Sequence, residues 1–317
     1  MPLEPTLREL SKAMAGATPP LSAAEMDAAE ARRRAAIRTR ISGLPDDTAE
    51  PEQMVCWRGG QLRMRVTAGP ADGPLVLYLH SGGWVAGSTA ATQRACRALA
   101  SGLGATVVSL DYPLAPEYPY PAALESTLTA LRWLASSESG LPGDPGTVIL
   151  AGESAGGNLA AAALLRLRDG KEQLSVRAAL LIVPVLDRDF SRTSYQRFDR
   201  GDIDGRSGMH WYAEQYLAAS GAAAADSPYV WPLRSGWLGG LPPMVLVQAQ
   251  YDPLGDEQCE WATRVSADGG RIELRRYPGV GHSFFGLDHL SPTARHAQEE
   301  ACLALTGILC GRQWSLP

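Results

Sequence analysis

Residues 148–160, with the sequence VILAGESAGGNLA, decide the fold. An unbroken apolar run enters the sequence GESAG at residues 152–156, and an alanine-rich segment follows it. This is a G-x-S-x-G motif in the strand–turn–helix setting that presents a serine hydroxyl at the end of a sheet. The flanking glycines leave room for a sharp turn, and the following helix directs its positive N-terminal end at the serine. Because a chance match would lack this setting, the stretch predicts that Ser154 is a nucleophile.

The segments around this stretch predict a parallel sheet. Five short segments are apolar throughout, at residues 75–79, 106–110, 147–151, 179–185 and 244–249. Strands of this kind are buried on both faces, which indicates a mostly parallel sheet covered by helices. Segments of helical length lie between them, at residues 91–101, 122–135 and 158–168. The alternation predicts a doubly wound α/β fold, preceded by an antiparallel hairpin.

Two segments have no place in this alternation. Residues 1–45 are predicted to form amphipathic helices, and Ser22 with Glu25 forms a capping box that starts the second one. Residues 187–226 are too long for a strand–helix crossover, and an insertion of this size is usually functional. We expect both segments to form a helical cap. The catalytic domain is then made of residues 46–186 and 227–317.

The composition fits a globular protein and gives no support to nucleic-acid binding. The 317 residues carry a formal net charge of −5, with 45% hydrophobic and 20% charged residues. No apolar run approaches the ~18 residues of a membrane span. The start, MPLEPTLREL, lacks the basic residues and apolar core of a signal peptide, so a cytoplasmic location is expected. One basic cluster in the second expected helix is interpreted as a solvated face: Arg32, Arg33, Arg34, Arg38 and Arg40.

The sequence predicts neither a cofactor nor a metal. Lys12 and Lys171 lie outside any G-x-x-x-x-G-K-[S/T] frame, and H-E-x-x-H does not occur. The five cysteines contain no C-x-x-C pair, which argues against a disulfide framework and a zinc site. All five stand in apolar neighbourhoods and are expected to be small buried residues: Cys56, Cys96, Cys259, Cys302 and Cys310.

A nucleophilic serine needs a base, and the base needs an orienting carboxylate. After a G-x-S-x-G turn of this kind, the acid comes next along the chain and the histidine last. Asp252 follows the apolar strand MVLVQAQY, at the edge where α/β sheets bind ligands. Asp256 and Glu257 come later and are expected to cap a helix or form salt bridges there. Asp252 is therefore the predicted acid.

The predicted base is His282, which lies in the loop GVGHSFFG after the strand RIELRRYPG. A side chain in this loop can reach back over the edge of the sheet. The other four histidines fit less well, because one precedes the serine, one lies in the insertion and two lie near or inside the last helix: His80, His210, His289 and His296.

A second glycine-rich stretch, LYLHSGGWVAG at residues 77–87, follows another buried strand. Adjacent glycines after a strand indicate that backbone N–H groups approach something closely. Ser81 stands directly before Gly82 and Gly83, but it lies in no turn that would make it a nucleophile. His80 is expected to anchor this loop rather than to titrate in catalysis.

The chain resembles the hormone-sensitive-lipase-like branch of the α/β-hydrolases, which includes many bacterial carboxylesterases. The resemblance covers nearly the whole chain and rests on HSGGW, DYPLAPEYPYPAAL, GESAGGN, YDPLGDE and GHSFF. It implies an α/β-hydrolase fold with a helical cap in the positions given above. It also implies that Ser154 is the nucleophile, Asp252 the orienting acid and His282 the base.

The resemblance further implies an oxyanion hole made of the N–H groups of Gly82, Gly83 and Ala155. Ser81 replaces only the first glycine of the family's H-G-G-G pattern, so these three donors are retained. Pro113 stands where the family usually has arginine, which indicates that a contact of that loop is lost.

The substrate pocket is only sketched by the sequence. Six residues of the glycine loop, the insertion and the histidine loop are candidates to line it: Trp84, Tyr195, His210, Trp211, Tyr212 and Phe284. Each of them is about as often a core residue as a pocket residue.

The leading prediction is a serine hydrolase that cleaves a small-molecule carboxylic ester, with a short acyl chain, through an acyl-enzyme. Hydrolysis of an amide or acetyl group on a specialised metabolite stays open, because the same machinery serves both reactions. The family also includes non-catalytic receptors, which the retained serine, acid and histidine argue against, and a dehydratase. A homodimer through an edge strand near residues 271–278 is common among the relatives, and nothing in the sequence decides it.

Overall fold

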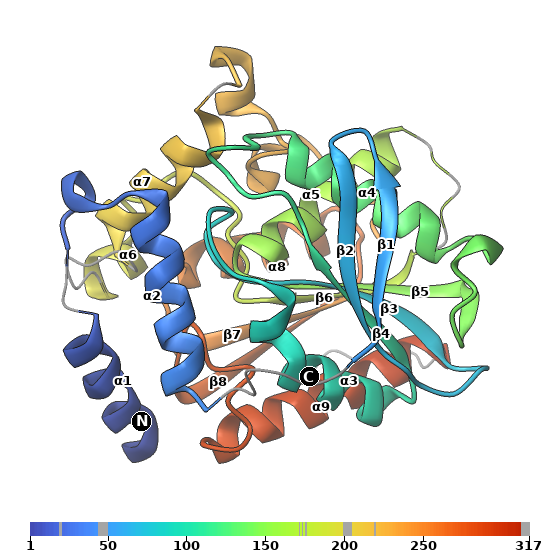
Figure 1. Ribbon diagram of the computed structural model, residues 1–317, viewed down its shortest axis with the longest axis horizontal. Coiled ribbons are helices and arrows are strands. Elements are labelled where there is room, and N and C mark those ends of the chain that lie inside the picture. Colours follow the sequence, from blue (N-terminus) through green and yellow to red (C-terminus); the bar gives the residue numbers. More distant parts are fainter. Residues whose placement is uncertain are drawn as a thin grey trace.

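The computed structural model describes residues 1–18, 21–43, 50–170, 172, 174, 176–198, 205–218 and 220–311. Within these ranges, eight strands form one sheet in the order β1-β2-β4-β3-β5-β6-β7-β8 (Figure 1). The strands are β1 Glu52–Trp57, β2 Gly60–Thr67, β3 Pro74–Leu79, β4 Thr106–Asp111, β5 Asp144–Glu153, β6 Val176–Ile182, β7 Met244–Tyr251 and β8 Ile272–Gly281. The pairs β1–β2 and β2–β4 are antiparallel and the others are parallel. The predicted hairpin and mostly parallel sheet are therefore confirmed.

Helices cover both faces of the sheet, as its apolar strands require. One core cluster joins the sheet to α4 (Ala122–Leu134), α5 (Ala155–Asp169) and α8 (Gly255–Ala267). A second cluster on the opposite face joins it to α3 (Gln93–Leu103) and α9 (Pro292–Leu309), and Figure 1 shows these two helices side by side below the sheet. Continuous apolar burial on two faces gives the sheet its stability, since buried apolar area contributes about 25 cal/mol per Å².

The strand order creates one switch point, and the functional loops meet there. The chain passes from β3 to β4 on one side and later adds β5 on the other side of β3. At the carboxyl ends of this pair, Leu79 lies opposite Gly152. The glycine loop after β3 and the serine turn after β5 are therefore neighbours, at the place where open α/β sheets bind ligands.

The remaining helices gather at one end of the sheet (Figure 1). They are α1 Pro5–Ala17, α2 Ala28–Ile41, α6 Thr193–Phe198 and α7 Arg206–Leu217. The first residues dock on the last two strands, because Glu4 N–H donates to Gly279 O of β8 at 2.9 Å and Tyr251 Oη of β7 donates to Met1 O at 2.7 Å. The expected domain boundary at residues 45–46 and part of the insertion, residues 199–204, lie outside the described residues.

The predicted start of the second helix is wrong. Ser22 does pair with Glu25, with Oγ donating to the carboxylate at 2.7 Å, but this pair closes a short 3-10 turn. The helix begins at Ala28, where Asp27 Oδ1 accepts the N–H of Glu30 at 2.8 Å. Two successive N-cap signals compete here, and the second one starts the long helix.

The solvated basic face is also wrong in part. Arg34 is buried, and its Nε donates to Glu30 at 2.8 Å. Arg32 reaches away from its helix to backbone carbonyls of the catalytic domain, whereas Arg33 is exposed. Helical periodicity marks an apolar face but cannot show which long polar side chains another element will cover.

The prediction that all five cysteines are buried is wrong for three of them. Cys96 and Cys302 are buried, whereas Cys56 and Cys310 are exposed and Cys259 is partly exposed.

In the described part of the chain, no cluster of three His, Cys, Asp or Glu side chains has the arrangement of a metal site. No helix in the same ranges combines the length and apolarity needed to cross a bilayer.

Candidate active site

Ser154 is the single residue between β5 and α5, and its backbone has φ 56° and ψ −115°. Positive φ is uncommon for a residue with a Cβ, so the surrounding chain must enforce it. The glycines around the turn permit this by close backbone contact: a Cβ on Gly152 would lie 2.2 Å from Gly156 O, and one on Gly156 would lie 2.2 Å from Leu79 O. Only glycine fits at either position, as the motif predicts.

The structure brings Ser154, His282 and Asp252 into one hydrogen-bonded chain. Ser154 Oγ lies 2.9 Å from His282 Nε2, and His282 Nδ1 lies 3.0 Å from Asp252 Oδ1. Because a carboxylate only accepts, Nδ1 carries the proton and Nε2 is left to accept from the serine hydroxyl. His282 directly follows β8 and Asp252 directly follows β7, so three parallel strands deliver the three side chains to one edge.

Asp252 is almost fully buried, and both of its oxygens have further donors. Oδ1 accepts the N–H of Leu254 at 2.9 Å, and Oδ2 accepts Gln258 Nε2 at 3.0 Å. A buried carboxylate held in this way stays in one orientation, which fixes the ring of His282. Gln258 was missed from the sequence. The available signal was its place in the first turn of the helix that starts just after Asp252.

The glycine loop presents unpaired backbone donors beside Ser154. Gly82 has φ 130° and Gly83 has φ 60°, and a Cβ on Gly83 would lie 2.3 Å from the ring of Tyr212. Among the contacts between described residues, none gives a partner to the N–H of Gly82, Gly83 or Ala155. Donors without partners, one of them at the N-terminus of α5, are suited to negative charge.

His80 and Ser81 shape the base of this loop. His80 Nδ1–H donates to Ser81 O at 2.7 Å, and its ring stacks on Tyr112 with centroids 4.0 Å apart. Burial lowers the pKa of His80, so the ring is neutral. Positive φ begins at Gly82, one residue after Ser81, and the serine Cβ therefore causes no backbone strain.

Four of the six pocket candidates lie in the core, namely Trp84, Phe284, Tyr195 and Trp211, and the first two belong to the catalytic loops. Trp84 is fully buried and stacks on Tyr216 with centroids 4.7 Å apart, and its indole N–H donates to Asn158 Oδ1 at 3.3 Å. Phe284 is buried beside Tyr277, with centroids 5.9 Å apart. Both side chains brace the loops that carry the site.

The other four candidates belong to the insertion. Tyr195 is buried against Phe190, His210 is exposed at the edge of the same ring, and Trp211 is buried beside Tyr212. The ring of Tyr212 packs directly on Gly83. Of the six, Tyr212 is therefore the side chain that the structure places against the glycine loop.

Glu153, the residue before the serine, is a buried acid. Tyr78 Oη donates to its carboxylate at 3.4 Å, and burial raises the pKa of Glu153 to about 7, against the opposing influence of His282. A group with this pKa is partly ionised at neutral pH. The site thus contains a second buried carboxyl group besides that of Asp252.

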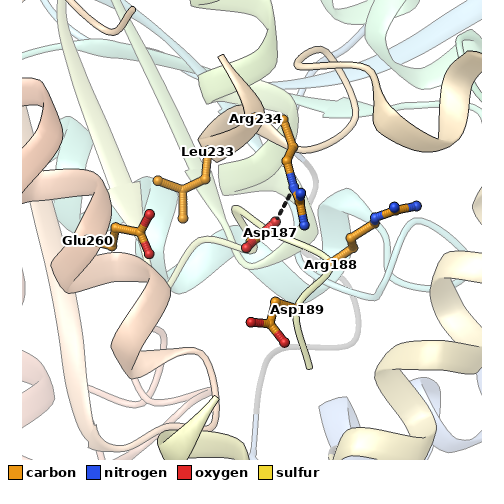
Figure 2. A pocket seen from close by; sticks show the side chains of 6 residues that line it. All are labelled: Asp187, Arg188, Asp189, Leu233, Arg234 and Glu260. Atoms are coloured by element: carbon orange, nitrogen blue, oxygen red, sulfur yellow. Dashed lines mark hydrogen bonds and ion pairs between the residues drawn. The ribbon is translucent and has the colours of Figure 1, made fainter. Parts of the chain in front are cut away.

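A polar cavity of about 510 Å³ lies away from these residues, at the junction of the insertion and the catalytic domain (Figure 2). It is lined by Asp187, Arg188, Asp189, Leu233, Arg234 and Glu260. Its charges are paired across the junction: Asp187 accepts Arg234 Nε at 2.8 Å and Arg192 Nη2 at 2.6 Å. The cavity therefore marks an ion-pair network rather than a second reactive centre.

Comparison with known proteins agrees with this geometry. A family model described as alpha/beta hydrolase fold matches residues 76–286. The esterase LipI of Mycobacterium tuberculosis is 32% identical over 287 residues, which cover 87% of this chain and 89% of that protein. The ethyl acetate hydrolase of Pseudomonas putida is 31% identical over 281 residues, which cover 86% of this chain and 87% of that protein.

A solved structure is similar over almost the entire length. The hyperthermophilic esterase of the archaeon Pyrobaculum calidifontis superposes with a TM-score of 0.87 at 33% sequence identity, and the match covers 98% of this chain and 99% of that one. The strand order, the serine turn and these similarities agree, and the chain therefore belongs to the α/β-hydrolase family, in its hormone-sensitive-lipase-like branch of bacterial carboxylesterases.

Proposed function

We propose that this protein is a carboxylesterase in which Ser154 attacks the carbonyl carbon of the substrate. His282 Nε2 accepts the serine proton and then gives it to the leaving alcohol, while Asp252 stabilises the imidazolium. Water, activated by the same histidine, releases the acyl group. The observation that carries this proposal is the hydrogen-bonded chain from Asp252 to Ser154, at 3.0 and 2.9 Å.

The N–H groups of Gly82, Gly83 and Ala155 are the proposed oxyanion hole. They are fixed by loop and helix geometry before substrate arrives, so they need no reorganisation when the tetrahedral intermediate forms. Loss of one such donor typically lowers kcat by about 10²–10³-fold. Their lack of other partners among the described residues supports this assignment.

The proposed substrate is a small-molecule ester with a short acyl chain. Support comes from the insertion, because the ring of Tyr212 in α7 packs directly on Gly83 of the proposed oxyanion hole. The names of the relatives, among them an ethyl acetate hydrolase, agree with a small ester.

The test is the initial rate of hydrolysis of p-nitrophenyl acetate, butyrate and octanoate. We expect the rate to fall with acyl length and to vanish in Ser154→Ala, while a fluorophosphonate probe labels the wild type and not the variant. Full activity of Ser154→Ala would contradict the assignment of the nucleophile. Faster cleavage of a matched anilide than of the ester would favour amide hydrolysis instead.

A further inference from the structure

Arg32 connects the N-terminal helix α2 to the loop that follows the oxyanion glycines. Its Nε donates to Val85 O at 2.9 Å, and its Nη2 donates to Ala115 O at 3.1 Å. The same guanidinium pairs with Glu117, with Nη1 at 2.9 Å and Nη2 at 2.5 Å from the two carboxylate oxygens. One side chain therefore holds two backbone carbonyls and one carboxylate from two separate loops.

The two carbonyls belong to the framework of the glycine loop. Gly82 O accepts the N–H groups of Val85 and Ala86, at 3.2 and 2.9 Å, and this closes the turn. Ala115 N–H then donates to Trp84 O at 2.9 Å, which joins the turn to the segment after β4. Arg32 binds the carbonyl groups of Val85 and Ala115, which are the first carbonyls after the two groups joined by this hydrogen bond.

The burial of the partners separates the roles of these contacts. The Arg32 side chain is 36% exposed and that of Glu117 is 52% exposed, so their ion pair contributes little to stability. Val85 and Ala115, in contrast, are buried. The contacts that matter for the shape of the loop are therefore the two bonds to backbone carbonyls.

We propose that Arg32 is a positioning residue for the oxyanion hole. It holds the segment that follows Gly82 and Gly83, so that the N–H groups of these glycines point at the developing oxyanion. The inference rests on the carboxylesterase function proposed above. The oxyanion hole then depends on a side chain from the N-terminal helices. Arg32 also brings a guanidinium to the loop that contains Pro113, where the family usually has arginine.

The geometry requires arginine rather than a positive charge alone. A guanidinium is planar and presents five donors in a fixed fork, whereas an ammonium is a compact charge on a flexible stem. Lysine at position 32 can keep the ion pair with Glu117 but cannot hold both carbonyls in the same plane. Because misplacement of a catalytic group by about 1 Å can cost 10²-fold in rate, loss of this restraint is expected to cost about tenfold.

The test compares Arg32→Gln and Arg32→Lys with Arg33→Gln as the matched control. Arg33 lies on the same helix, is 53% exposed and pairs with Glu30. For each protein, kcat and KM are measured on p-nitrophenyl butyrate, together with the Ki of an alkyl trifluoromethyl ketone. Ser154 Oγ adds to the carbonyl carbon of this ketone and its proton passes to His282 Nε2, which gives a tetrahedral adduct whose oxyanion lies in the hole.

For Arg32→Gln we expect kcat to fall about tenfold, KM to change by less than about twofold, and the ketone Ki to rise by the same factor as kcat/KM falls. Arg32→Lys should lie between this variant and the wild type, and Arg33→Gln should match the wild type. A kcat within about twofold of wild type in Arg32→Gln overturns the proposal. So does a loss of kcat without a matching rise in Ki, which is the result of a purely structural role.

The failure of the proposed function gives a different result. Either the wild type does not hydrolyse the ester, or Ser154→Ala retains the activity. If Arg32→Gln does not give folded protein by circular dichroism, Arg32→Lys decides by the same two criteria.

Discussion

At the scale of single residues, the backbone around Ser154 explains how an uncommon conformation persists. Strained φ/ψ values cost about 1–3 kcal/mol and survive where neighbouring structure determines them. Here Ser154 N–H donates to Ile182 O and Ser154 O accepts from Asn158 N–H, both at 2.9 Å. The parallel neighbour β6 and the first turn of α5 therefore fix the backbone on both sides, and the hydroxyl stays directed at His282.

Gly83 offers a direct test of the glycine loop. In Gly83→Ala, the new methyl group would meet the ring of Tyr212 at 2.3 Å in a backbone with φ 60°. We expect kcat on p-nitrophenyl butyrate to fall about 10²-fold, because a proposed oxyanion donor is displaced.

The matched control for this change is Gly104→Ala. Gly104 has nearly the same φ, 59°, but open space where its Cβ would lie. Its alanine variant should lose about 1–2 kcal/mol of stability from the left-handed conformation and keep its kcat. If kcat falls equally in both variants, the loss of kcat comes from the strained left-handed backbone and not from displacement of the glycine loop.

Glu153 predicts a pH dependence of stability. Its pKa rises from 4.5 to about 7 on folding, so the folded protein retains a proton that the unfolded chain has lost between these values. The free energy of unfolding therefore falls as the pH rises from 4.5 to 7 and is constant with respect to this group above that range. This loss is absent in Glu153→Gln. We therefore expect the free energy of unfolding of Glu153→Gln, relative to that of the wild type, to increase by about 3 kcal/mol between pH 4.5 and 7.

Urea unfolding at several pH values measures this difference. Glu172 provides a contrast, because its hydrogen bond to Arg132 lowers its pKa. Glu172→Gln should therefore lose stability relative to wild type as the pH rises toward 4.5, which is the opposite sign in a lower pH range, and should show no further change between pH 4.5 and 7. A difference between Glu153→Gln and wild type that does not vary with pH would mean that Glu153 does not titrate in this window.

At the scale of elements, the start of α2 depends on which of two N-cap signals forms the helix. Asp27 accepts the N–H of Glu30, whereas Ser22 serves a separate short turn. Asp27→Ala should lower the free energy of unfolding in urea by about 1 kcal/mol. Ser22→Ala should lower it by less, because no long helix depends on it; equal losses would favour the capping box as the start of one continuous helix.

The sequence predicts some elements well and others poorly, for physical reasons. Buried strands and the glycine turns are readable because every position in them is restricted, either to apolar residues or to residues without a Cβ. Gln258 and Arg32 were not found as functional residues, because each acts on a partner that lies nearby only in the folded chain. The prediction that Trp84 lines the pocket fails for the same reason, because the aromatic side chains that bury it come from distant segments.

At the scale of the whole molecule, β8 is the edge of the sheet, and among the described strands it pairs with β7 alone. Glu4 covers the end of this edge at Gly279, and the rest of the edge is a surface on which a second copy can add a strand. We propose a homodimer through this edge, as the resemblance to the family implies. Light scattering should then give twice the chain mass of 33.8 kDa.

Hydrogen exchange locates the interface in the same samples. Backbone amides of β8 should exchange more slowly in concentrated than in dilute protein. A mass of one chain at every concentration would contradict the dimer, and a dimer without protection at β8 would place the interface elsewhere.

The docking of the N-terminus on β8 has a consequence for synthesis on the ribosome. Glu4 hydrogen-bonds Gly279, so the first residues to emerge cannot reach their final position until one of the last strands exists. His282 likewise emerges 128 residues after Ser154, which at about 5–20 residues per second is a delay of roughly 6–25 seconds. A nascent chain thus contains Ser154 before the histidine that activates it has been synthesised. Hydrolytic activity can therefore appear only after β8, which His282 directly follows, has joined the sheet.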